Sequence, residues 1–280
     1  MIIDIHAHTF PDKIAEKAVN KLQAASHTKP FTNGTVNALR ESMNRAGIDY
    51  SVLLPVATNP GQVSKINDGA ADLNLKANKI LSFGAMHPDF PDWYHELSRM
   101  KNLGLKGVKL HPIYQHTNFD DLKYIRILNR AGELNLIILI HAGLDVGYPG
   151  AVHASPRMIY NAIQAAGPVK LILAHMGGWR NWDEVENLLP DTGVYLDTSF
   201  SLGYMTPNGD GYYKTSQDLE LLQEAQFIRI IRKFGANKIL FGTDSPWGDQ
   251  ARELQKIRDL PLTPSEQSAI LGDNAAKLLF

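Results

Sequence analysis

The chain has 280 residues, of which 44% are hydrophobic, and its 28 Lys and Arg residues nearly balance its 29 Asp and Glu residues. This composition suits a large globular core, and without a basic block it gives no nucleic-acid or anionic-membrane surface, so a small molecule is the expected partner. Cysteine is absent, which excludes disulfides, thiolate metal ligands and a cysteine nucleophile, and the longest apolar run, residues 136–140, is far shorter than the roughly 20 residues of a membrane span.

The first predicted element is a strand that begins at Ile2 and carries two histidines, His6 and His8. Because side chains alternate along a strand, both imidazoles project from the same face, as in a chelate for a metal ion. The same pattern also occurs on exposed strands, where both histidines face water. The other histidines of the chain decide between these two interpretations.

The rest of the chain alternates between helical and strand periodicity. Strands are predicted over residues 50–56, 80–86, 107–111, 136–141, 169–175, 194–197 and 239–242, and helices within residues 11–33, 36–46, 63–78, 93–101, 122–128, 159–166 and 227–234. Eight strands alternating with helices, without a linker or low-complexity tract, predict an α/β fold of the (β/α)8 TIM-barrel type in one domain, residues 1–280. A doubly wound open sheet is the alternative, but it favours a Gly-rich turn after the first strand, where this chain has His-Ala-His-Thr.

The carboxyl ends of barrel strands meet at one mouth, and chemistry-bearing residues stand at these ends. Six of the ten histidines lie at predicted strand ends: His6, His8, His87, His111, His141 and His175. Asp244 follows the last strand in Phe-Gly-Thr-Asp-Ser-Pro. Three imidazoles and a carboxylate with an open position suit zinc, with manganese or iron as harder alternatives.

Five motifs, which span nearly the whole chain in order, resemble the amidohydrolase superfamily, and specifically its amidohydrolase 2 branch with the aminocarboxymuconate-semialdehyde decarboxylase-like enzymes. The motifs are Ile3–His8, Gly107–Pro112, Ile172–Gly178, Phe241–Pro246 and Ile270–Leu279. Two other barrel families share parts of this pattern. The polymerase-and-histidinol-phosphatase barrels have a late Asp-x-His, whereas no histidine follows His175 here, and the TatD-type nucleases have a glutamate where this chain has Lys109.

The resemblance implies a role for each matching residue. His6 and His8 are similar to the first metal-binding pair, His141 to the third ligand, and Asp244 to the carboxylate that binds metal and moves protons. His175 resembles a catalytic histidine that is either an acid/base or the ligand of a second metal. We expect one divalent ion, most simply zinc, and a second ion only if Lys109 is carbamylated.

These roles lead to a metal-dependent hydrolase that acts on a small molecule, with an amide, lactone or related bond, through a metal-activated water. The alternative is a metal-dependent non-oxidative decarboxylase on the same ligands, and a non-catalytic metal-binding barrel is the third interpretation. We expect a cytoplasmic protein without nucleic-acid or membrane partners. A homodimer is left open.

Five further residues stand where they could contact the substrate or support a ligand: Lys109, His111, His87, Asp197 and Trp247. Each also has an ordinary structural explanation, such as an ion pair for Lys109, a strand-end turn for His87 and a loop cap for Asp197. The segment Met205–Lys214 is interpreted either as a lid over the site or as a subunit contact.

Overall fold

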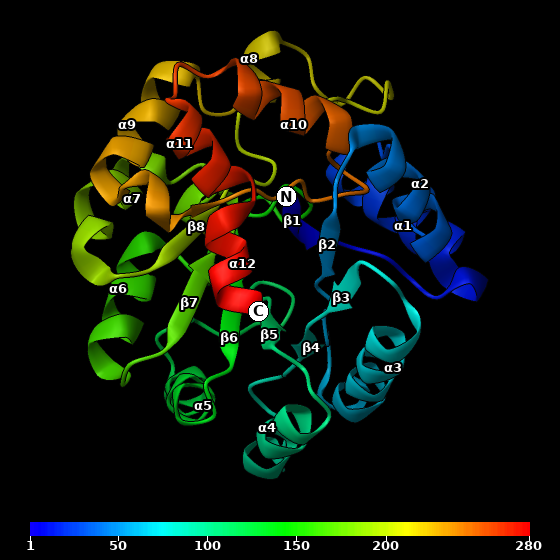
Figure 1. Ribbon diagram of the computed structural model, residues 1–280, viewed down its shortest axis with the longest axis vertical. Helices are drawn as coiled ribbons and strands as arrows, with labels where there is room; N and C mark the ends of the chain where they lie inside the picture. Colours follow the sequence, from blue (N-terminus) through cyan, green and yellow to red (C-terminus); the bar gives the residue numbers. More distant parts are fainter.

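The computed structural model describes residues 1–280 and shows strands surrounded by helices (Figure 1). The strands are β1 (Ile3–Ala7), β2 (Tyr50–Leu53), β3 (Ile80–Ser82), β4 (Gly84–Ala85), β5 (Gly107–Leu110), β6 (Ile137–Ile140), β7 (Lys170–Leu173), β8 (Tyr195–Asp197) and β9 (Ile239–Leu240). The α-helices are α1 (Asp12–Ser26), α2 (Val36–Ala46), α3 (Val63–Lys76), α4 (Trp93–Asn102), α5 (Leu122–Glu133), α6 (Pro156–Ala165), α7 (Trp182–Leu188), α8 (Ser216–Leu219), α9 (Glu224–Phe234), α10 (Gln250–Asp259), α11 (Pro264–Ser268) and α12 (Asn274–Leu279). Short 3-10 turns η1 (Pro60–Gln62), η2 (His175–Gly177), η3 (Pro190–Thr192) and η4 (Ala236–Lys238), and one π-turn, η5 (Ala269–Asp273), complete the fold.

The strands follow one another in sequence order and all pair in parallel, as β1-β2-β3 and as β4-β5-β6-β7-β8-β9. Backbone hydrogen bonds also join the first and last strands, since the Ile5 amide donates to the Phe241 carbonyl at 2.9 Å and the Asp244 amide donates to the His6 carbonyl at 2.8 Å. The predicted (β/α)8 architecture is confirmed.

The predicted strand over residues 80–86 is divided into β3 and β4, because side chains of α3 replace strand partners at this point. Asn74 Oδ1 accepts the Ser82 amide at 2.6 Å, and Asn67 Oδ1 accepts the Ala85 amide at 2.8 Å. The first half therefore pairs with β2 and the second half with β5. The helices α7, α8, α10, α11 and α12 were not predicted from the sequence.

Helix ends have the residues that local chemistry favours. The Thr35 hydroxyl accepts the Ala38 amide before α2, and Gly47 ends that helix in the left-handed region with φ 71°. Ser155 caps α6 in the same way ahead of Pro156.

Both faces of the strands are buried. Ile138 and Ile140 of β6 belong to a core cluster of 53 buried residues, whereas Ile137 and Leu139 belong to a second cluster of 12, together with residues of α12. A packed interior inside a helical layer is typical of this barrel. The interior leaves the strand ends free to present polar side chains at one edge.

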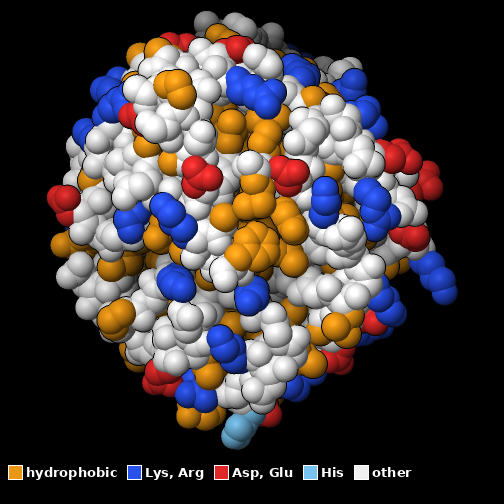
Figure 2. Space-filling model, in the orientation of Figure 1, with side chains coloured by type: hydrophobic (Ala, Val, Ile, Leu, Met, Phe, Trp, Pro, Cys, Tyr) orange, Lys and Arg blue, Asp and Glu red, His pale blue; other side chains and the backbone are white.

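The face seen in Figure 1 has interspersed acidic and basic side chains around a central group of hydrophobic ones (Figure 2). This mixture matches the near-balance of charge in the sequence. None of the helices combines the length and apolarity that crossing a bilayer requires.

Candidate metal centre

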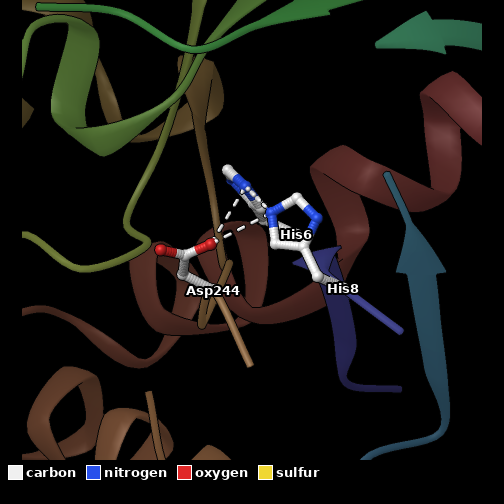
Figure 3. Close-up of side chains that lie close together, drawn as sticks. All are labelled: His6, His8 and Asp244. Carbon is white, nitrogen blue, oxygen red and sulfur yellow. Dashed lines mark hydrogen bonds and ion pairs between the residues drawn. The ribbon is translucent and has the colours of Figure 1, made fainter. Parts of the chain in front are cut away.

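His6 at the end of β1, His8 just after it and Asp244 after β9 point their polar atoms at one position (Figure 3). The two Nε2 atoms lie 3.1 Å apart, and Asp244 Oδ1 lies 3.4 Å from that of His6 and 3.2 Å from that of His8. Ligands that share a metal ion at about 2.1 Å stand at such separations from one another. The chelate expected from His-x-His therefore gains its carboxylate from the opposite end of the chain.

The outer ring nitrogens of both histidines face acceptors, and this defines their tautomers. His6 Nδ1–H donates to Asp197 Oδ2 at 2.8 Å, and His8 Nδ1–H donates to the Leu54 carbonyl at 2.9 Å. Each Nε2 is therefore a lone pair directed at Asp244 and at the other histidine. Acceptors behind the rings are the usual way in which proteins orient metal-binding imidazoles.

His141 and His175 repeat this arrangement beside the first pair. His141 Nε2–H donates to the Leu144 carbonyl at 2.9 Å, and His175 Nδ1–H donates to the Ser199 carbonyl at 3.0 Å. The remaining atoms, His141 Nδ1 and His175 Nε2, are lone pairs that face each other at 3.1 Å. Two facing lone pairs repel unless a cation lies near them, so this donor set fits a divalent metal.

The titration behaviour of the site also fits a metal. Burial lowers the pKa of His141 to about 4 and that of His175 to about 4, so both imidazoles are neutral near pH 7. Burial would raise the pKa of Asp244, but its close contacts with the His8, His6 and His175 imidazoles hold that pKa well below its usual range. Deprotonated nitrogen and oxygen donors are what a metal ion requires.

Lys109 of β5 is fully buried next to this centre, with Nζ 3.4 Å from His6 Nε2. Burial lowers the pKa of its ammonium to about 8. A substantial fraction of neutral amine is therefore present at mildly alkaline pH, and carbamylation needs the amine.

Two of the proposed site residues have strained backbones. His175 has φ 58° and Asp244 has φ 60°, a region that residues with a Cβ rarely adopt. Met176, which follows His175, and Phe200, which follows its hydrogen-bond partner Ser199, are also left-handed, with φ 52° and 48°. Strain of this kind collects at functional sites, where the surrounding structure holds it in place.

Residues 3–280 match the model of the amidohydrolase family, which the chain covers almost from end to end. The chain belongs to this family. A search of curated proteins with the sequence of this chain finds no match.

Solved structures match the fold over its full length. A TIM-barrel protein from Bordetella bronchiseptica has 17% identity and a TM-score of 0.75, covering 99% of this chain and 98% of that one. The 5-carboxyvanillate decarboxylase of Sphingomonas paucimobilis has 17% identity and a TM-score of 0.65, with the same coverage. The dihydroxybenzoic acid decarboxylase of Polaromonas, solved with manganese and 2-nitroresorcinol, has 15% identity and a TM-score of 0.67, covering 99% of this chain and 96% of that one.

A second group in this amidohydrolase has metal-binding composition, His111, His141 and Asp145, all buried. Asp145 Oδ2 lies 3.5 Å from His111 Nε2 and 3.7 Å from His141 Nε2. However, the same His141 atom donates its proton to the Leu144 carbonyl, so it has no lone pair to offer on this side. Asp145 therefore lies close to His141 without a hydrogen bond to it, and the group does not offer a complete second set of metal donors.

Of the remaining predicted residues, Asp197 and His111 contact the histidines of the site, whereas His87 does not. Asp197 contacts His6 directly, and the His111 ring is stacked between His141 and Tyr114, with centroid distances of 4.3 and 3.7 Å. His87 instead accepts the Asp89 amide at 3.1 Å and so closes the turn after β4.

Trp247 lies three residues beyond Asp244 and lines a cavity with Phe31 and Phe200. Phe200 follows Ser199 in the chain, so this cavity adjoins the loop that supports His6 and His175. A contact of Trp247 with the substrate stays a prediction.

Sequence reasoning missed Ser199 and Asp145. The Ser199 hydroxyl accepts from His6 Nδ1–H at 2.9 Å and from His175 Nδ1–H at 3.1 Å, and it donates to Asp197. Its place two residues after a strand-end aspartate is the signal that could have identified it. Asp145 has the equivalent signal, since it is a carboxylate four residues after His141.

The predicted lid segment is attached to the end of α1. Tyr212 stacks on His27 with centroids 3.7 Å apart, His27 Nδ1 lies 2.7 Å from Asp210 Oδ2, and the Tyr213 hydroxyl donates to the Ser26 carbonyl. These contacts hold residues 210–213 against the chain's own first helix.

Proposed function

We propose that this amidohydrolase is a metal-dependent enzyme that removes a carboxyl group, as carbon dioxide, from a small cyclic carboxylic acid. The observation that carries the proposal is the convergence of His6 Nε2, His8 Nε2 and Asp244 Oδ1 on one position, beside a second pair of facing imidazole nitrogens from His141 and His175. Two structurally similar proteins are named as a 5-carboxyvanillate decarboxylase and a dihydroxybenzoic acid decarboxylase. These names favour decarboxylation, which was the alternative in the sequence analysis, over hydrolysis, which was its first interpretation.

One divalent ion would be held by the nitrogen donors His6, His8 and His141 and by the carboxylate of Asp244. When bound, it acts as a Lewis acid that polarises a coordinated oxygen of the substrate. We favour a single ion because a Lys109 ammonium would repel a second one. Manganese in a relative's structure makes it an alternative to zinc.

His175 is the proposed acid/base. Its Nδ1–H is held by Ser199, so proton exchange takes place at Nε2, which faces the metal ligands. Asp244 can accept a proton and return it to the carbon that loses the carboxyl group. Burial of His6, Lys109 and His175 keeps bulk water away from the developing carbanion.

Hydrolysis of a lactone or amide is the second candidate. It is favoured by the ionised Asp244 beside two imidazoles, which is placed to take a proton from water. A cytoplasmic location and a homodimer stay predictions.

The decisive experiment supplies the purified protein with zinc or manganese and offers it hydroxybenzoic and other cyclic carboxylic acids, lactones and amides in H2¹⁸O. Carbon dioxide release without ¹⁸O in the product supports decarboxylation, whereas ¹⁸O in the product supports hydrolysis. His6→Ala and Asp244→Ala should lose bound metal and activity together while keeping the wild-type circular-dichroism spectrum. Absence of bound metal after reconstitution would refute both reactions.

A further inference from the structure

The turn that presents His175 is an unusual piece of backbone. His175, Met176 and Gly177 have φ values of 58°, 52° and 88°, so three residues in succession are left-handed. Such a run needs outside contacts, because two of its members have a Cβ that disfavours this region. The direction of the His175 ring depends on this backbone, since φ and ψ set the direction of the Cα–Cβ bond.

Three groups of His175 are held from outside the turn. Its amide donates to Asp197 Oδ1 at 3.1 Å, and its ring Nδ1–H donates to the Ser199 carbonyl at 3.0 Å. Its carbonyl accepts the indole N–H of Trp182 at 2.9 Å. The amide of Gly178 is the other donor to this carbonyl, but at 3.4 Å it is close to the limit of a hydrogen bond.

We propose that Trp182, the first residue of α7, is a positioning residue for His175, the acid/base of the proposed function. Its indole N–H fixes the His175 peptide in the left-handed conformation and thereby keeps Nε2 facing His141 Nδ1 at 3.1 Å. Without this bond the carbonyl is left with a weak partner in a buried place, and the peptide relaxes toward an ordinary φ. The ring then turns away from the metal ligands.

The chain contains a matched control, Trp179. The two indoles have similar burial, with 6% of Trp179 and 9% of Trp182 exposed, and they lie three residues apart. The indole N–H of Trp179 has no hydrogen-bond partner. Trp182→Phe and Trp179→Phe therefore remove the same ring and N–H group, but only Trp182→Phe breaks a hydrogen bond.

The test reads His175 directly, by NMR of metal-free protein with ¹⁵N-labelled histidine, assigned with His175→Asn. In Trp182→Phe we expect the His175 ring nitrogen shifts to move and its Nδ1 proton to exchange with water about tenfold faster, the effect of one lost hydrogen bond. Trp179→Phe should leave both unchanged. Replacing Trp182 by 3-benzothienylalanine, which has the same shape without the N–H, should reproduce the effect if the phenylalanine variant does not fold.

Unchanged His175 signals in a folded Trp182 variant, or equal changes in both tryptophan variants, would overturn the proposal. Because this measurement needs neither metal nor substrate, its outcome is independent of the proposed function. Once a substrate is known, kcat of Trp182→Phe should fall roughly 10- to 100-fold with KM and metal content unchanged, as expected for a misplaced catalytic group. A rise in KM alone would contradict the positioning role.

Discussion

Asp197→Asn tests the argument that outer partners orient the metal ligands. Every group around the Asp197 carboxylate is a donor: His6 Nδ1–H faces Oδ2, and the amides of His175 and Ser199, with the Ser199 hydroxyl, face Oδ1. Asparagine has only one oxygen, so its NH2 group must face either His6 or the other donors. If the oxygen stays with the three donors, the His6 ring has to shift its proton to Nε2 and loses the lone pair that would bind metal.

We expect the dissociation constant for zinc or manganese to rise 10- to 100-fold, about 1.4–2.7 kcal/mol, the usual cost of removing such a partner. Competition against a chromophoric chelator at pH 7 measures it. Asp145→Asn is the control, because this carboxylate is also buried and lies 3.7 Å from a His141 nitrogen that already donates to Leu144. Wild-type affinity in a folded Asp197→Asn protein would refute the tautomer argument, and an equal loss in both variants would show a general effect of charge.

Three further predictions follow from the same structure. His175→Asn should retain its metal by elemental analysis while activity falls roughly 10²–10⁴-fold, and an unimpaired variant would remove His175 from the mechanism. The free energy of unfolding of the metal-free protein should decrease as pH falls from 6.5 to 4, because unfolded histidine binds protons with a pKa near 6.5 and folded His141 only near 4. His141→Asn should reduce this decrease by about 3 kcal/mol or less, as measured by urea unfolding. An equal pH dependence of the unfolding free energy in wild type and variant would contradict this prediction. Gly143→Ala should lower the thermal unfolding temperature more than Gly104→Ala. Both glycines are left-handed, but only the added methyl group at Gly143 would meet the Trp179 backbone, at 2.2 Å. Equal decreases in both variants would show that backbone conformation alone sets the cost.

The sequence was sufficient to predict the barrel and the strand ends that meet at its mouth. Alternation of apolar segments indicated the strands, and parallel strands in sequence order bring His6, His141 and Asp244 to one edge. The metal-binding roles of these residues stay predictions. The division at Phe83 was not predictable, because it depends on Asn67 and Asn74 reaching the strand from a neighbouring helix.

The contacts that hold the rings of His6 and His175 could not be predicted from the sequence, even where the residue that makes them could have been noticed. Ser199 meets two histidine rings through a loop in which Phe200 is left-handed, and Trp182 reaches back to His175 around another left-handed turn. Such contacts depend on the conformation of single residues, which leaves no periodic pattern in the amino-acid sequence. Hydrophobic periodicity therefore locates a strand end but not the groups that hold it.

The joining of β1 to the segment after β9 has a consequence for the order in which the molecule is made. The Thr243 amide and hydroxyl bind Asp4, a partner 239 residues earlier in the chain. At the same seam Asp244 meets the proposed metal ligands His6, in β1, and His8, just after it. Contacts of such sequence separation form late, because the intervening chain must be ordered first. A nascent chain on the ribosome thus exposes His6 and His8 long before their carboxylate partner has been synthesised. If these residues bind the proposed metal ion, the complete ligand set exists only after the barrel has closed.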